Sequence, residues 1–154
     1  MTLPLAVAVK SFLGLYVLTP FEQELLKRLS EALEPSDREV LAYQLGHFTT
    51  VRRLLKHLDD PKAYGFTNFH TMRFGKSVAY ERQTKRFASS EKEALLATAR
   101  VTFEGGEMTV QFWLVNGVLF SLEYRSPQNI YYPSGDYRIE SITVWPKTEL
   151  APLV

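Results

Sequence analysis

The sequence contains no cysteine and only three histidines, His47, His57 and His70. Without cysteine the chain has neither disulfides nor thiolate metal sites, and a reducing compartment such as the cytoplasm is the expected location. The histidines do not occur in the H-x-E or H-E-x-x-H spacings that are typical of zinc sites. We therefore expect no metal site and no cofactor.

The chain also lacks a clean hydrophobic run long enough to cross a membrane. Residues 3–18 are largely apolar, but Pro4, Lys10 and Gly14 interrupt them and no basic segment precedes them. Their apolar positions repeat at helical spacing, which favours a helix that packs in the core. A membrane-associated or secreted form is the alternative reading. We expect no membrane partner.

Recognisable catalytic motifs are absent as well. Ser121 is flanked by phenylalanine and leucine, whereas a nucleophile elbow requires glycines. Asp59-Asp60 precedes a proline and is typical of a turn. Gly105-Gly106 lies between two glutamates, which would repel a phosphate. Whether the chain is an enzyme stays open, and the sequence favours a protein that is not one.

What is present is the composition of an ordinary globular domain. The 154 residues are 45% hydrophobic and 23% charged, which is enough to bury one core. We expect a single α+β domain over residues 1–154, with a helical part at about 1–46 and a strand-rich part at about 47–146.

Two helices have recognisable start signals. Thr19 and Glu22 form a capping box, with Pro20 at the first helical position, and apolar residues then repeat at 3.6-residue spacing until Pro35. A second box begins at Ser36 and predicts a shorter helix that ends at about Gly46.

Strand signals follow. Residues 49–55 are read as either a strand or a helical turn, whereas residues 65–74 and 95–103 favour strands. A two-residue turn at Gly105-Gly106 would pair Phe103 with Met108 and continue one apolar face.

The next turn is predicted from face consistency. At Asn116-Gly117 a two-residue loop would bring Phe120, Leu122 and Tyr124 to the face opposite Phe112. A three-residue loop over 115–117, with a bulge at Gly117, pairs Leu114 with Val118 and keeps these apolar residues together.

A last strand over residues 137–145 completes the pattern. Helices followed by strands joined through tight turns predict an α+β fold, in which N-terminal helices pack on one face of an antiparallel meander of four to six strands.

Charge is unevenly distributed along the chain. Residues 1–45 hold four basic and six acidic side chains, residues 46–88 nine and three, and residues 89–154 five and eight. The basic middle part contains a segment, 70–87, in which cations alternate with aromatics, a pattern that suits phosphate contacts and base stacking. The candidate binding residues here are Arg73, Lys76, Tyr80, Arg82, Lys85 and Arg86. A solvated loop, or an acidic protein partner, would explain the same pattern.

Trp113 is the second candidate binding element. The predicted register puts it on the polar face of the sheet, where tryptophan is typical of an interface anchor. The loop 126–135 carries Tyr131 and Tyr132, which would either cover Trp113 or form a contact surface of their own.

Residues 95–127, which include VNGVLFSLEYRSP after a Gly-Gly hairpin, resemble a pattern in small uncharacterised bacterial α+β proteins, some of them similar to immunity proteins. The resemblance rests on structural residues and implies no catalytic residue. It favours a non-enzymatic protein-binding module, with a bacterial immunity or regulatory protein as its most specific form. The alternatives are a nucleic-acid-binding domain that uses segment 70–87 and, third, a small-ligand-binding protein or enzyme that uses His70 or Glu81.

Overall fold

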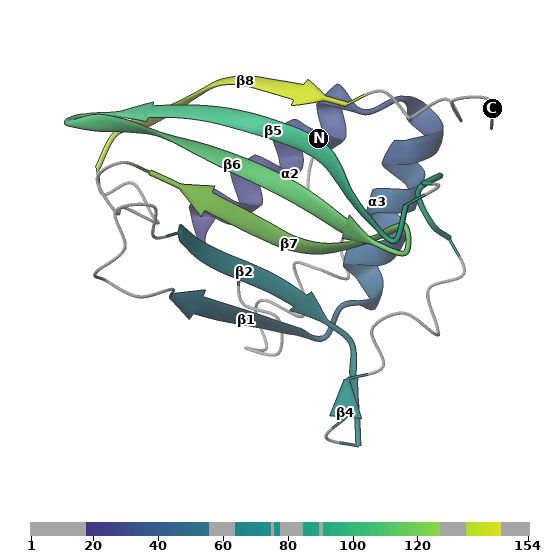
Figure 1. Cartoon of the computed structure of the whole chain (residues 1–154). Helices are drawn as coiled ribbons and strands as arrows, with labels where there is room; N and C mark the ends of the chain where they lie inside the picture. Colours follow the sequence, from purple (N-terminus) through teal and green to yellow (C-terminus); the bar gives the residue numbers. More distant parts are fainter. Residues whose placement is uncertain are drawn as a thin grey trace.

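The computed structural model describes residues 18–55, 64–74, 76–77, 85–89, 91–126 and 135–145. Helices α2 and α3 pack on one face of a six-stranded antiparallel sheet with the strand order β1-β2-β7-β6-β5-β8 (Figure 1). The predicted α+β class is therefore confirmed. The elements are α2 (Pro20–Ala32), α3 (Pro35–His47), β1 (Thr50–Leu55), β2 (Tyr64–His70), β5 (Glu93–Phe103), β6 (Gly106–Val115), β7 (Val118–Arg125) and β8 (Tyr137–Val144), with a small separate hairpin of β3 (Met72–Arg73) and β4 (Lys76–Ser77).

Helix α2 begins with the predicted capping box. The Glu22 amide donates to Thr19 Oγ1 at 3.2 Å, and the Thr19 amide donates to Glu22 Oε2 at 3.1 Å. Two amide groups at the helix start are thereby satisfied by side chains. The face that the apolar spacing predicted is buried in the core, including Phe21, Leu25 and Leu29.

Helix α3 begins two residues earlier than predicted. Pro35 lies in its first turn and Glu34 is the N-cap, with no side-chain cap bond, so the prediction of a capping box at Ser36 was wrong. Proline is well suited to a first turn because its missing N–H needs no partner there, and it therefore starts α3 rather than stopping α2. Arg38 instead serves the end of α2, since its guanidinium donates to the carbonyls of Ser30 at 2.8 Å and Leu33 at 3.1 Å.

The ambiguous residues 49–55 form a strand, β1, which pairs with β2 from Thr50↔His70 onward. The predicted strand 65–74 is split, because β2 ends at His70. Beyond it, Thr71 Oγ1 donates to the His47 carbonyl at 3.0 Å and the Met72 amide donates to Thr49 Oγ1 at 2.8 Å. These side-chain bonds lead the backbone away from the sheet and into the projecting β3–β4 hairpin (Figure 1).

The β5–β6 turn lies at Glu104–Gly105 rather than at Gly105-Gly106. Gly105 has φ of +91°, and Gly106 already pairs with Phe103. Val101 therefore pairs with Met108, two residues away from the predicted register. A shift of two residues leaves every side chain on its face, so the apolar pattern could not distinguish the two turns.

The β6–β7 connection differs from the prediction in a more informative way. Asn116 and Gly117 form a two-residue turn with φ of +50° and +75°, and Val115 pairs with Val118, so the predicted three-residue loop was wrong. A bulge in β7 then shifts the register by one residue: Leu114 pairs with Leu119 but Trp113 pairs with Ser121, so Phe120 between them has no cross-strand partner on β6. Both the turn preference for Asn-Gly and the apolar face are thus satisfied.

Two further bulges adjust the neighbouring strands. The pairing of β5 with β6 skips Leu96, and the register between β5 and β8 shifts at Glu140. The second bulge changes which residues of β8 face the helices: Ile139 is buried before it, and Ile142 and Val144 pack against the core after it. Strict alternation along 137–145 therefore could not predict the core residues of this strand.

Contacts at both edges of the sheet hold α2 across one face. At β1, Arg53 forms an ion pair with Glu22, and at β8 Arg28 Nη2 donates to the Ile139 carbonyl at 3.2 Å. Tyr137, also on β8, donates to Glu24 Oε2 and packs edge-on against Phe21 with ring centroids 5.0 Å apart. The helix is consequently fixed in direction as well as in position.

The predicted helix over residues 3–18 lies almost entirely outside the described residues, although Leu18 is buried in the core. Within the described parts of the chain, neither helix has the length and apolar character needed to cross a membrane.

Candidate functional site

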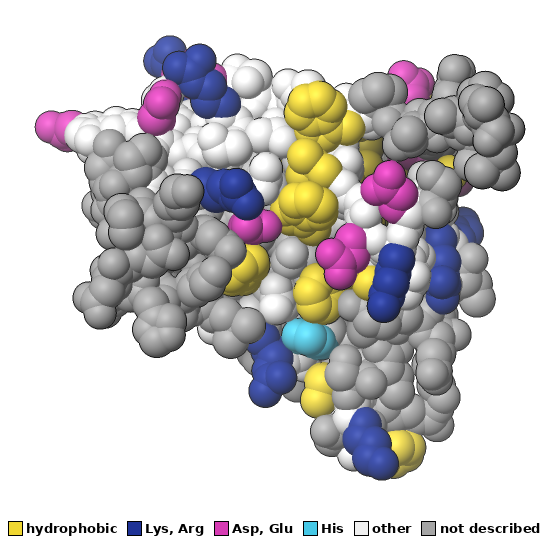
Figure 2. All heavy atoms as spheres, in the orientation of Figure 1, with side chains coloured by type: hydrophobic (Ala, Val, Ile, Leu, Met, Phe, Trp, Pro, Cys, Tyr) yellow, Lys and Arg dark blue, Asp and Glu magenta, His cyan; other side chains and the backbone are white. Residues whose placement is uncertain are grey.

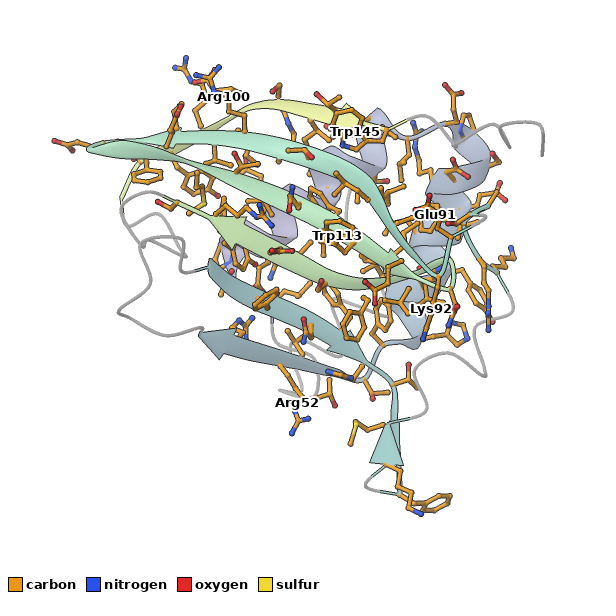
Figure 3. All side chains as sticks on the ribbon, in the orientation of Figure 1. Arg52, Glu91, Lys92, Arg100, Trp113 and Trp145 are labelled. Carbon is orange, nitrogen blue, oxygen red and sulfur yellow. The ribbon has the colours of Figure 1, made fainter. Side chains whose placement is uncertain are left out.

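The sheet has one face that α2 and α3 cover and a second face, called here the open face, that points away from them (Figure 1). Hydrophobic side chains gather on the open face in a row that runs across the strands (Figure 2). Trp113 and Trp145 both lie on this face, as the labelled side chains show (Figure 3). The prediction that Trp113 faces away from the core is therefore correct.

The strand register explains how the row is built. Leu95 pairs with Trp113, Trp113 pairs with Ser121, and Ser121 pairs with Asn68, so these four residues cross four strands side by side. Phe66 lies two residues before Asn68 on β2 and is half-buried on the same face. A small serine thus lies between larger neighbours.

Phe120 joins this group because of the bulge. The pairing of β6 with β7 skips it, and its half-buried ring lies edge-on to His70 with centroids 6.0 Å apart. The sequence pattern assigns Phe120 to the apolar face, and this assignment is wrong. The bulge moves Phe120 to the open face, where it lies next to Ser121.

Phe66, Trp113 and Phe120 surround Ser121 and form a shallow cavity of about 240 Å³, called here the aromatic depression. Its other lining residues are Glu93, Leu114, Val115 and Glu123, so the described lining contains two carboxylates and no lysine or arginine. The indole N–H of Trp113 donates to Gln111 Oε1 at 3.4 Å, which fixes the ring at the edge of the depression.

The polar groups around the depression are mainly hydrogen-bond acceptors. The Glu123 side chain is only 10% exposed, and its Oε1 accepts from Arg125 Nη2 at 3.0 Å. Asn68 Oδ1 is buried and has no hydrogen-bond partner among the described residues. Burial, and secondarily the nearby charge of Arg52, lowers the pKa of His70 below its usual 6.5. The lower pKa favours the neutral form of His70 at pH 7.

Trp145 extends the apolar row toward β8. It is 48% exposed, and its indole N–H donates to Thr98 Oγ1 at 3.1 Å. The predicted partners of Trp113 in the loop 126–135, Tyr131 and Tyr132, lie outside the described residues.

Segment 70–87 is described only in part. Lys76 is exposed on β4 and Arg73 belongs to β3, whereas Tyr80 and Arg82 lie outside the described residues. Lys85 lies over the Tyr43 ring at 5.7 Å, and Arg86 Nη1 donates to the Asn116 carbonyl at 3.4 Å. Lys85 thus lies against α3 and Arg86 against the β6–β7 turn. Lys76 lies on a different element, the β3–β4 hairpin.

One exposed aromatic was not among the predicted binding residues. Phe74 lies at the turn of the β3–β4 hairpin, is 91% exposed, and has φ of +51°. A bulky residue is uncommon in the left-handed region, and such conformations cluster at functional positions.

The histidines do not form a metal site in the described parts of the chain, where no cluster of three or more His, Asp or Glu side chains occurs. His47 Nδ1 lies 2.8 Å from the Tyr43 carbonyl within α3, and His70 lies on β2. His57 lies outside the described residues.

Comparison with known proteins gives no relative from which a role could be transferred. No protein-family model, no curated protein and no solved structure matches this chain.

Proposed function

We propose that this protein is a non-enzymatic protein-binding module that recognises its partner through the open face of the sheet. The single observation that supports the proposal most strongly is the aromatic depression around Ser121, on a face that neither described helix covers. Half-buried aromatic rings at the centre of a polar face are typical of interface hot spots.

The surroundings of the depression also favour a protein partner over a small ligand. Its volume of about 240 Å³ is below the roughly 300 Å³ at which sites for small molecules begin. The polar residues next to it, such as Gln111, would form the rim of an interface. A cytoplasmic immunity or regulatory protein is the most specific form of this proposal, because such proteins act by binding alone.

Affinity capture from a lysate of the source cells tests the proposal. The full chain, the Trp113→Ala variant and the Thr109→Ala variant are used as baits. Thr109 lies on the same strand and face as Trp113 but outside the depression, and it therefore serves as the matched control. We expect one protein to be retained by the wild type and by Thr109→Ala, and to fall at least about tenfold with Trp113→Ala.

The variants must first be shown to be folded, by circular dichroism and thermal unfolding. Should a folded Trp113→Ala protein retain the same partner in the same amount, the open face would not be the interface.

A second candidate function is nucleic-acid binding, and Phe74 is the observation that favours it. An aromatic ring that is 91% exposed, two residues before the exposed Lys76, offers a stacking surface next to a phosphate contact. Single-stranded oligonucleotides labelled with a fluorophore should then bind at low ionic strength, and the binding should weaken steeply with added salt.

The matched variants for that test are Phe74→Ala with Lys76→Ala, and Arg138→Ala as an exposed cation on β8. We expect the first pair to weaken binding and the second change to leave it nearly unaltered. Absence of binding at about 50 mM salt would eliminate this candidate.

A further inference from the structure

The aromatic depression also indicates which kind of side chain binds there. We infer that it receives a lysine or arginine side chain of the protein partner, an inference that rests on the proposed function. Three features of the depression support this ligand: its rings, its carboxylates and the unsatisfied acceptor next to them.

The rings supply a surface that attracts cations. Phe66, Trp113 and Phe120 line the depression, and a cation over the face of an aromatic ring is attracted by the negative charge of its π system. Tryptophan is the strongest of these rings in that respect. The aliphatic part of a lysine or arginine would at the same time contact the apolar walls.

The charges of the lining give the sign of the ligand. Glu93 and Glu123 both line the depression, and none of the described lining residues is a cation. Glu123 already accepts a guanidinium hydrogen bond from Arg125, whose side chain is 53% exposed. That contact uses Oε1, and because a carboxylate offers about four lone-pair sites on its two oxygens, Glu123 has the capacity to accept from a second cation.

Asn68 provides a further acceptor. It is the cross-strand partner of Ser121, which lines the depression, and its buried Oδ1 has no hydrogen-bond partner in the described part of the chain. Cross-strand neighbours lie about 5 Å apart at Cβ, within the reach of a long side chain. Buried acceptors are nearly always satisfied, so a donor from a bound partner would complete this group. Lysine and arginine carry several donors and no acceptor.

The nearby cationic groups do not prevent this binding. His70 is next to Phe120, but burial and the charge of Arg52 lower its pKa and so favour its neutral form at pH 7. Arg52 is paired with Asn68 on the far side from Ser121 and is exposed. A surface charge of this kind is screened by solvent and salt more strongly than the carboxylate of Glu123.

The test uses small probes and the full chain. N-acetyl-lysine methylamide and N-acetyl-arginine methylamide are titrated against ¹⁵N-labelled protein, with the uncharged N-acetyl-norleucine methylamide for comparison. We expect saturable shifts of the Trp113 indole and of the Phe66, Phe120 and Ser121 amides at concentrations on the order of millimolar for the cationic probes. The norleucine probe should bind at least about fivefold more weakly, since it lacks the charge.

Two variants locate the charge dependence. Glu123→Gln should weaken the cationic probes at least about threefold, because it removes the buried carboxylate. Glu107→Gln is the matched control, since Glu107 also pairs with an arginine, Arg100, but at an exposed position outside the depression. It should leave both affinities unchanged.

Equal shifts with all three probes, or cationic shifts that do not involve the depression, would overturn the inference. In that event, a partner whose capture still requires Trp113 would leave the proposed function intact and reject only the cationic anchor. Failure of both experiments would reject the two together.

Discussion

Replacing Arg53 with methionine is expected to lower the free energy of unfolding by about 3 kcal/mol, because the change leaves a buried carboxylate without its cation. Glu22 is fully buried and receives two hydrogen bonds from Arg53, one from Nε at 2.9 Å and one from Nη2 at 2.6 Å. Since the Arg53 side chain keeps 31% of its exposure, the expected loss lies at the lower end of the range for buried pairs.

Glu22 also joins other elements to α2, which makes its charge costly to leave unpaired. Its Oε1 accepts from the Thr67 hydroxyl on β2 at 3.0 Å and lies 3.5 Å from the hydroxyl of Tyr124 on β7. The same carboxylate completes the capping box with Thr19. One side chain therefore links the start of α2 with three strands of the sheet.

The adjacent arginine is the control for this prediction. Arg52 is exposed and lies on the open face, so Arg52→Met should change the stability by less than about 0.5 kcal/mol. Adding Glu22→Gln to Arg53→Met should recover part of the loss, because it removes the unpaired buried charge while the amide oxygen still accepts one of the two hydrogen bonds that Thr19 and Thr67 donate to Glu22.

Urea denaturation of the wild type, the two single variants and the double variant measures these differences in the free energy of unfolding. In thermal unfolding, the melting temperature of Arg53→Met should be roughly 10 °C below that of the wild type. Equal effects of Arg52→Met and Arg53→Met would contradict the role assigned to the Glu22–Arg53 pair.

The second large effect is expected at Gly117. Gly117→Ala should cost about 3 kcal/mol, because the change combines a strained backbone with a steric conflict. Gly117 has φ of +75°, and a Cβ there would lie 2.5 Å from the Phe87 carbonyl oxygen. Phe87 is buried, and its amide donates to the Gly117 carbonyl at 2.9 Å, so the segment 85–89 cannot move away without losing contacts.

Gln44 explains why this turn has no freedom to shift in the other direction. Its buried amide accepts from the Leu119 N–H at 2.9 Å and donates to the carbonyls of Gly117 at 3.0 Å and Lys85 at 3.1 Å. The Gln44 side chain, on α3, therefore holds both the β6–β7 turn and the segment 85–89 that packs on this turn. A displacement of Gly117 would therefore break its own bond to Gln44.

Gly105→Ala separates the two causes. Gly105 has φ of +91°, but a Cβ at this position would meet no atom of the described residues within 4 Å, so only backbone strain of about 1–2 kcal/mol is expected. Denaturant unfolding measures both variants, and hydrogen exchange at the Phe87 amide reports whether segment 85–89 has detached. An equal loss of stability in the two variants would show that the steric conflict contributes nothing.

The sequence predicts the parts of the fold that depend on local chemistry. The capping box of α2, the apolar face of β6 and that of β5 from Ala97 onward follow from residue types and spacing, and they are confirmed. The alternation also assigned Leu95 to the apolar face, which is wrong, because the bulge at Leu96 places Leu95 beside Trp113 on the open face and buries Leu96. The turn positions were wrong, because a two-residue shift at Gly105 preserves every face and because a bulge at Phe120 repairs the face after a two-residue turn. Bulges depend on the neighbouring strands, which a single sequence does not display.

The candidate site was predictable only in part, for a related reason. Trp113 was identified because buried and less buried residues alternate without interruption along β6. Phe120 was assigned to the core because the position of the bulge was unknown. Phe66 and Glu123 could be recognised as neighbours only from the pairing of β2 with β7. That pairing joins strands that are far apart in the sequence, so no local pattern predicts the aromatic depression.

The central claim is that the open face binds a protein with Trp113 near the centre of the interface. Calorimetric titration of the captured partner into the wild type, Trp113→Ala and Thr109→Ala tests this claim most directly. We predict that Trp113→Ala weakens the affinity at least about 30-fold, which corresponds to a hot-spot contribution of about 2 kcal/mol, and that Thr109→Ala has little effect. Equal affinities for the wild type and a folded Trp113→Ala protein would contradict the claim.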